Sequence, residues 1–330
     1  MSASLQLPVV DLSSMHDGAA ARLELARELD AACRQFGFFY LVGHGVQTRQ
    51  VQALMASARA FFDAPLDAKR SIHMSKGGRA WRGYFQLGEE LTSGRPDGKE
   101  GLYFGTELDE SDPRVQAGTP LHGRNVFPST PELRGAVLDY MEEITRVGHQ
   151  LMALLALGLS LKETFFRERY TGDPTILFRI FNYPRVADPT DGWGVGEHTD
   201  YGFITLLKQD TVGGLQVRHR DGWLEVPDVP DSFVCNVGDM LERLTRGRYL
   251  SALHRVRSSA RSDRLSMALF FDPAFDAALT PIETVAPDSY SPHTQVRWDD
   301  LDPHAVQQTY GEYLLSKVGR VFPWLREKAL

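Results

Sequence analysis

Seven short segments rich in β-branched and aromatic residues follow one another in the second half of the chain, and they constrain its fold more than any other feature. Turn residues separate these segments, which span 176–183, 194–198, 203–209, 215–219, 233–237, 254–257 and 265–271. Short strands at this spacing are typical of a β-sandwich or a β-barrel. We therefore expect a jelly roll in this half of the chain.

The first half of the chain has a helical pattern. Apolar residues recur at intervals of three and four between Pro131 and Gly158, which predicts one long amphipathic helix. We expect shorter helices over 20–36, over 48–62 and after Pro65, and a short buried strand over 38–42. Helices packed against a jelly roll give a fold that is mainly β, with the N-terminal helices backing the core.

These patterns divide the chain into three regions of one integrated structural unit. Residues 1–174 form the N-terminal helical and strand region, 175–280 the jelly-roll core, and 281–330 a C-terminal extension. Within the first region, residues 76–128 are rich in glycine, proline and polar side chains. This stretch is too long for an ordinary connection, so we expect short strands or a functional loop that covers a site.

Composition narrows the class of protein. The 330 residues carry 36 Lys and Arg against 43 Asp and Glu, a formal net charge of −7. A mildly acidic chain attracts neither nucleic acid nor anionic lipid, so we expect no nucleic-acid and no membrane partner. Cys33 and Cys235 are too few for a disulfide framework and lie in apolar stretches, where we expect them in the core. With no secretory signal pattern and no apolar run of membrane-spanning length, we expect a cytoplasmic protein.

The segment Glu197-His198-Thr199-Asp200 offers metal ligands. Residues two apart on a strand project to the same side, so His198 and Asp200 can meet at one point. His254 opens a later β segment and is the candidate third ligand. Two histidines and one carboxylate leave three coordination positions open, which suits non-haem Fe(II) working with O2.

A second pair with the same spacing, Arg264 and Ser266, opens the last β segment. An arginine in so apolar a strand is costly when buried without an anion, so we expect this pair to hold a carboxylate. The turn over 258–263 predicts that this strand lies beside the His254 strand, which would bring the anion near the metal. Tyr183 can add a phenol donor from another strand.

Together these motifs resemble the isopenicillin N synthase-like family of Fe(II) and 2-oxoglutarate dioxygenases. The resemblance covers most of the chain, including 7–12, 36–40, 43–46, 213–217 and 236–239. It implies a double-stranded β-helix with iron on His198, Asp200 and His254, through which these residues would be catalytic. It also implies that Arg264, Ser266 and Tyr183 bind the distal carboxylate of 2-oxoglutarate.

The resemblance implies an oxidoreductase that hydroxylates, desaturates or cyclises a small organic substrate with O2, releasing succinate and CO2. An alternative is an iron oxidase like isopenicillin N synthase, which uses O2 without 2-oxoglutarate. A third hypothesis is a binding module without turnover. Phe271, Arg82 and Tyr84 are candidate substrate contacts, whereas we expect the neighbouring Glu89 and Glu90 to form a solvated face.

Overall fold

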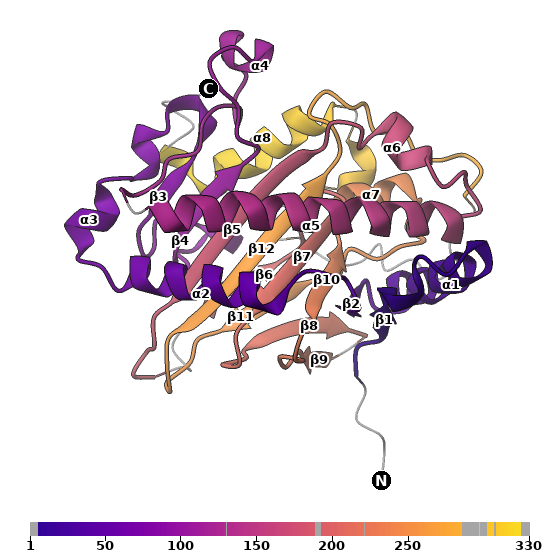
Figure 1. Ribbon diagram of the computed structural model, residues 1–330, viewed down its shortest axis with the longest axis horizontal. Coiled ribbons are helices and arrows are strands. Elements are labelled where there is room, and N and C mark those ends of the chain that lie inside the picture. Colours follow the sequence, from indigo (N-terminus) through magenta and orange to yellow (C-terminus); the bar gives the residue numbers. More distant parts are fainter. Residues whose placement is uncertain are drawn as a thin grey trace.

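The computed structural model contains two β-sheets with helices packed around them (Figure 1). It describes residues 6–129, 131–188, 193–220, 222–285, 297, 302–306 and 308–324.

The larger sheet has eight strands, which come from both halves of the chain. Their spatial order is β1 (Val9–Asp11), β2 (Phe38–Val42), β10 (Phe233–Val237), β7 (Ile204–Gln209), β12 (Arg264–Asp272), β5 (Thr175–Tyr183), β4 (Glu100–Gly105) and β3 (Gly83–Phe85). Strands β1 and β2 are parallel, and the other pairs in this sheet are antiparallel.

The smaller sheet is antiparallel and has four strands. Their order is β6 (Trp193–His198), β11 (His254–Arg257), β8 (Leu215–His219) and β9 (Gly222–Glu225). Side chains from both sheets line one cavity. The expected jelly-roll core is therefore present, and its interior is accessible to a ligand.

Eight α-helices are present in the described part of the chain. They are α1 (Ala19–Gln35), α2 (Thr48–Phe62), α3 (Leu66–Arg70), α4 (Pro113–Gln116), α5 (Pro131–Gly158), α6 (Phe165–Arg169), α7 (Asp239–Leu244) and α8 (Tyr310–Val321). Helix α5 has the predicted bounds and runs across one face of the large sheet, with α2 beside it (Figure 1). It buries the predicted apolar stripe, including Val137, Ile144 and Leu151, against the sheet and its neighbouring helices.

The segment 76–128 contributes β3 and β4 to the large sheet, so it is part of the scaffold as well as a loop. Strand β9 was not among the predicted strands. Cys33 and Cys235 are buried free thiols, as expected, and burial raises the pKa of both. Within the described residues, no helix combines the length and apolar character that crossing a membrane requires.

One expected pairing is wrong. Residues 258–263 do not join β11 and β12 as a hairpin, because β11 pairs with β6 and β8 while β12 pairs with β5 and β7. Both edges of each strand are already occupied, so the turn carries the chain from the small sheet to the large one. Arg264 thus reaches the cavity from the opposite wall.

Candidate metal centre

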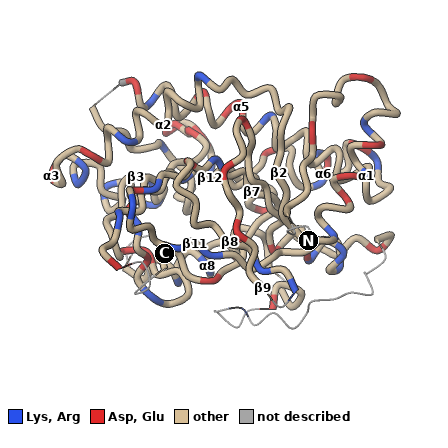
Figure 2. Tube along the Cα trace, turned by 90° about the horizontal axis from the view of Figure 1, so that it is seen from below, with Lys and Arg blue, Asp and Glu red and all other residues tan. Residues whose placement is uncertain are grey.

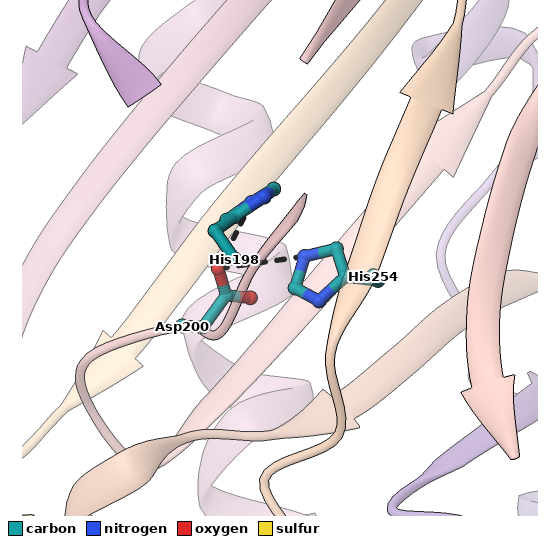
Figure 3. A group of neighbouring side chains, drawn as sticks. All are labelled: His198, Asp200 and His254. Atoms are coloured by element: carbon teal, nitrogen blue, oxygen red, sulfur yellow. Dashed lines mark ion pairs between the residues drawn. The ribbon is translucent and has the colours of Figure 1, made fainter. Parts of the chain in front are cut away.

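His198, Asp200 and His254 meet in the cavity between the two sheets. His198 ends β6 and lies directly opposite His254 in the antiparallel pairing of β6 with β11. Asp200 follows two residues after β6, and its Oδ1 lies 4.0 Å from His198 Nε2 and 3.8 Å from His254 Nε2. Figure 3 shows the three side chains turned toward one another. One ligand atom from each lies within 4.8 Å of the others, which is close enough to share one ion.

Hydrogen bonds to the scaffold orient each of these ligand atoms. The Nδ1 atoms of His198 and His254 lie 2.9 and 3.2 Å from the carbonyl oxygens of Gly196 and Ala252, which leaves both Nε2 atoms toward the centre. Such contacts fix the tautomer and the ring orientation of a metal-binding histidine.

Asp200 is held in the same way. Its Oδ2 accepts hydrogen bonds from Thr205 Oγ1 and, at 2.8 Å, from Asn236 Nδ2. Oδ1 is then the oxygen that faces the two histidines. These hydrogen bonds are contacts that the sequence analysis missed, although a polar residue inside the apolar strands β7 and β10 is itself a signal.

The electrostatics favour a cation between these groups. Burial, followed by the neighbouring His254, lowers the pKa of His198 to about 3, so its imidazole is neutral at pH 7. Burial opposes ionisation of Asp200, but His254, His198 and the two hydrogen bonds hold the pKa of its carboxyl below the usual range. A neutral imidazole and an ionised carboxylate are the protonation states that bind a metal. The donor set therefore fits Fe(II).

Arg264 is buried in the same cavity with unused hydrogen-bond donors. Its exposed fraction is 1%, and its Nε and Nη1 have no hydrogen-bond partner among the residues that the structure describes. Nη2 donates to Gln209 Oε1 at 3.2 Å. A buried guanidinium with two free donors is a strong site for a planar anion such as a carboxylate.

The two expected companions of Arg264 lie beside it. Tyr183 is directly opposite Arg264 in the pairing of β5 with β12, and its ring centre lies 4.9 Å from the guanidinium carbon. Ser266 projects from the same face of β12 and lines the cavity. The structure thus brings together all six residues proposed for iron and 2-oxoglutarate.

The candidate substrate contacts do not join them. Phe271 lies on the opposite face of β12, against His149 of α5, since side chains alternate along a strand; Phe270 faces the cavity instead. Arg82 and Tyr84 are both buried rather than solvated. Arg82 donates to the carbonyl of Leu121 and Tyr84 to Glu100. None of the three predicted substrate contacts is among the residues that line the cavity.

The expectation for Glu90 is also wrong, because Glu90 is 2% exposed and lines the cavity. Its carboxylate pairs with Lys99 at 2.8 Å and accepts a hydrogen bond from Tyr103 at 2.6 Å. Three residues of the segment 76–128, namely Glu90, Thr92 and Lys99, contribute to the cavity wall.

Comparison with known proteins agrees with this chemistry. A family model described as the N-terminal region of a non-haem dioxygenase in morphine synthesis matches residues 7–130, and the model of the 2OG-Fe(II) oxygenase superfamily matches 165–273. A Dictyostelium discoideum protein named as an iron/ascorbate oxidoreductase is 42% identical over 98% of this chain and 97% of its own. The chain belongs to the 2OG-Fe(II) oxygenase superfamily.

Solved structures place this oxygenase among proteins of the same fold. A 2OG-Fe(II) oxygenase family protein from Caulobacter crescentus is 26% identical with a TM-score of 0.78, covering 94% of this chain and 98% of that one. JOX2 in complex with 2OG, Fe and JA is 27% identical with a TM-score of 0.72, covering 96% and 91%. The predicted family, jelly-roll fold, cofactors and activity are confirmed at this level: the protein is an Fe(II)- and 2-oxoglutarate-dependent dioxygenase.

Proposed function

We propose that this dioxygenase holds Fe(II) on His198, Asp200 and His254 and uses O2 and 2-oxoglutarate to hydroxylate, or otherwise oxidise, a C–H bond of a small organic molecule. Succinate and CO2 are the co-products. The observation that carries this proposal is the presence of the metal-ligand triad and the buried Arg264, with its free donors, in one cavity.

Each residue has a defined task in this scheme. Fe(II) bound to two histidines and one carboxylate supplies the O2 chemistry that protein side chains lack. Thr205 and Asn236 keep Asp200 Oδ1 toward the metal. Arg264 and Ser266 bind and orient the distal carboxylate of 2-oxoglutarate, while the Tyr183 ring packs against the guanidinium.

Apolar side chains form much of the remaining wall, including Phe38, Val195, Leu207 and Leu215. They exclude water from the reacting groups, which strengthens the electrostatic contacts inside the cavity. They also favour the body of a small organic substrate.

The test is succinate formation from 2-oxoglutarate with Fe(II) and O2. We expect activity in the wild type and none in His198→Ala. Oxidation of a substrate with no requirement for 2-oxoglutarate would favour the cosubstrate-independent oxidase instead. Ligand-induced stabilisation without O2 consumption would favour a binding module.

The remaining proposals concern context. Basic residues (blue) and acidic residues (red) are interspersed over the trace in Figure 2, and the formal net charge is −7. This charge pattern supports a protein without nucleic-acid or membrane partners. We also propose that the protein acts in the cytoplasm. The regions 1–174, 175–280 and 281–330 are proposed as parts of one unit. This is supported by β1 to β4, which share a sheet with the core strands.

A further inference from the structure

A second buried guanidinium, that of Arg179 on β5, faces the same cavity. Arg179 is 9% exposed, and no described residue forms a hydrogen bond with its Nε. Its guanidinium carbon lies 4.2 Å from the ring centre of Tyr103 and 4.8 Å from that of Phe270. The two rings fix the plane of the guanidinium, so its free edge is oriented before any ligand arrives.

Glu90 is the carboxylate that pairs with Arg179, and it does not occupy all the hydrogen-bond donors of the guanidinium. Glu90 Oε1 lies 3.5 Å from Arg179 Nη1, a long contact. The same oxygen accepts a shorter hydrogen bond from Tyr103, and the other oxygen of Glu90 pairs with Lys99. Glu90 therefore holds Arg179 in place but leaves other N–H groups of the guanidinium available to a ligand.

Among the described residues, the cations around Arg179 outnumber the carboxylates that are free to pair with them. Lys99 pairs with both Glu90 and Asp97, so these two carboxylates serve Lys99 and Arg179 together. Arg82 does not line this cavity but lies close enough to Arg179 for the two charges to interact, and within the described part of the chain its Nε also has no hydrogen-bond partner.

Three further carboxylates interact with this group of cations, and none removes the excess. The charge of Asp200 interacts with Arg179, but Asp200 is a proposed ligand of Fe(II), whose charge exceeds its own. The negative charge of Glu107 interacts with Arg82, but this carboxylate forms its ion pair with Arg134, at 2.9 Å. Asp272 faces the same cavity and acts on Arg179, but burial raises its pKa to about 7, so it supplies only part of a charge at neutral pH. An uncompensated buried cation is costly, and a bound anion removes that cost.

Arg179 is separated from the proposed 2-oxoglutarate anchor. Tyr183 pairs with Arg264, and Arg179 precedes Tyr183 by four residues on the same strand face, about 13 Å of extended strand. The cavity thus has two cationic anchors at different places, and a single 2-oxoglutarate molecule held by Arg264 leaves the second one available.

We infer that Arg179 binds a carboxylate of the primary substrate, which is therefore an organic acid with an apolar body. This inference rests on the proposed function, because it assigns Arg264 to 2-oxoglutarate. The acid group binds at the free edge of the Arg179 guanidinium, whose plane the rings of Tyr103 and Phe270 fix, and the apolar wall of the cavity receives the rest of the molecule. A charge-assisted pair of this kind changes affinity by about 10- to 150-fold.

The test compares carboxylic acids with their uncharged primary amides. The probes are phenylacetate, 3-phenylpropanoate, hexanoate and octanoate, each beside its amide, with succinate formation measured in the Fe(II)-loaded enzyme. The change in melting temperature of the Mn(II)-loaded protein, without O2, is a second and independent readout. We expect at least one acid to stimulate turnover. The same acid should produce a given rise in melting temperature at about one tenth of the concentration that its amide requires.

Variants assign the effect to Arg179. Arg179→Gln is expected to raise KM for the best acid at least about tenfold, to remove the preference for acid over amide, and to leave KM for 2-oxoglutarate within about twofold. Arg185→Gln is the matched control, since Arg185 is exposed just beyond the end of the same strand. Glu90→Gln removes the competing carboxylate and is expected to lower KM for the acid. Arg179→Lys keeps the charge, so the preference for acid should survive at lower affinity if Arg179→Gln fails to fold.

Three results would overturn the inference. One is a probe set in which no acid is better than its amide in either readout. The second is a loss of stability in Arg179→Gln and Glu90→Gln with an unchanged preference for acid. The third is a rise in KM for 2-oxoglutarate, rather than for the acid, in Arg179→Gln. Failure of the wild type to be stabilised by 2-oxoglutarate alone would count against the proposed function, while the acid and amide comparison of melting temperatures would still test Arg179.

Discussion

Replacing Arg264 with methionine separates ligand binding from folding. The two unpaired nitrogens of Arg264 are available for charge-assisted hydrogen bonds to 2-oxoglutarate, each of which contributes about 1.5–3 kcal/mol. Losing both costs at least about 3 kcal/mol of binding free energy. We therefore expect Arg264→Met to raise the Kd for 2-oxoglutarate by about 100-fold or more.

The same substitution should not weaken the ligand-free protein. The guanidinium is buried, and in the described part of the chain its one hydrogen bond is to Gln209, so an apolar side chain of similar length is neutral or stabilising there. At 2-oxoglutarate concentrations of 100 times the wild-type Kd, the ligand stabilises the wild type by about 2.7 kcal/mol. The same concentration would equal the Kd of the variant and stabilise it by only about 0.4 kcal/mol.

Urea denaturation of the Mn(II)-loaded proteins, with and without 2-oxoglutarate, measures both effects. Arg261→Met is the matched control, because Arg261 is exposed in the turn just before β12. A wild-type response to 2-oxoglutarate in Arg264→Met would show that Arg264 does not bind this ligand. A loss of several kcal/mol of stability in the variant without the ligand would show that the guanidinium stabilises the fold.

Three further predictions concern the scaffold around the site. Asn236→Leu removes a donor to Asp200, so Fe(II) affinity measured by anaerobic equilibrium dialysis should fall about 10- to 100-fold. Burial raises the pKa of Asp272 from 3.8 to about 7, so the folded metal-free protein retains a proton that the unfolded chain releases between these values. This carboxyl therefore destabilises the fold as the pH rises from about 4 to about 7. Asp272→Asn should make the urea midpoint less dependent on pH in this range, and an equal slope in both proteins would exclude a contribution from Asp272. Phe271→Ala should lower the free energy of unfolding by about 3–5 kcal/mol, because Phe271 packs against α5. It should leave KM for 2-oxoglutarate unchanged, whereas Phe270→Ala should alter KM for the substrate.

Local sequence patterns predicted most of the elements that build the site. The apolar period of α5 and the short runs that became β5, β6 and β11 depend on neighbours in sequence, so they could be identified without tertiary information. The metal ligands could also be predicted, because His198 and Asp200 are two residues apart at one strand and His254 follows in a later strand. Arg264 was identified by one physical argument, that a charge in an apolar strand needs a partner.

The same argument applied to Arg179 would have found the second anchor. Arg179 interrupts the apolar strand β5 as Arg264 opens β12, but only the structure shows that none of the described residues pairs with its Nε. The position of Glu90 could not be predicted, since its partner Lys99 meets it through the folding of an irregular loop. Phe271 was predicted as a substrate contact, whereas Phe270 lines the cavity. Both residues are apolar, so the strand pattern gives no contrast between the two faces there.

The most direct test of the account is an anaerobic titration of 2-oxoglutarate into the Fe(II)-loaded protein, followed by visible absorption. We predict a saturable band that is lost in His198→Ala and requires about 100-fold more 2-oxoglutarate in Arg264→Met. A protein that binds Fe(II) and shows no band would contradict it, as would an unchanged band in His198→Ala.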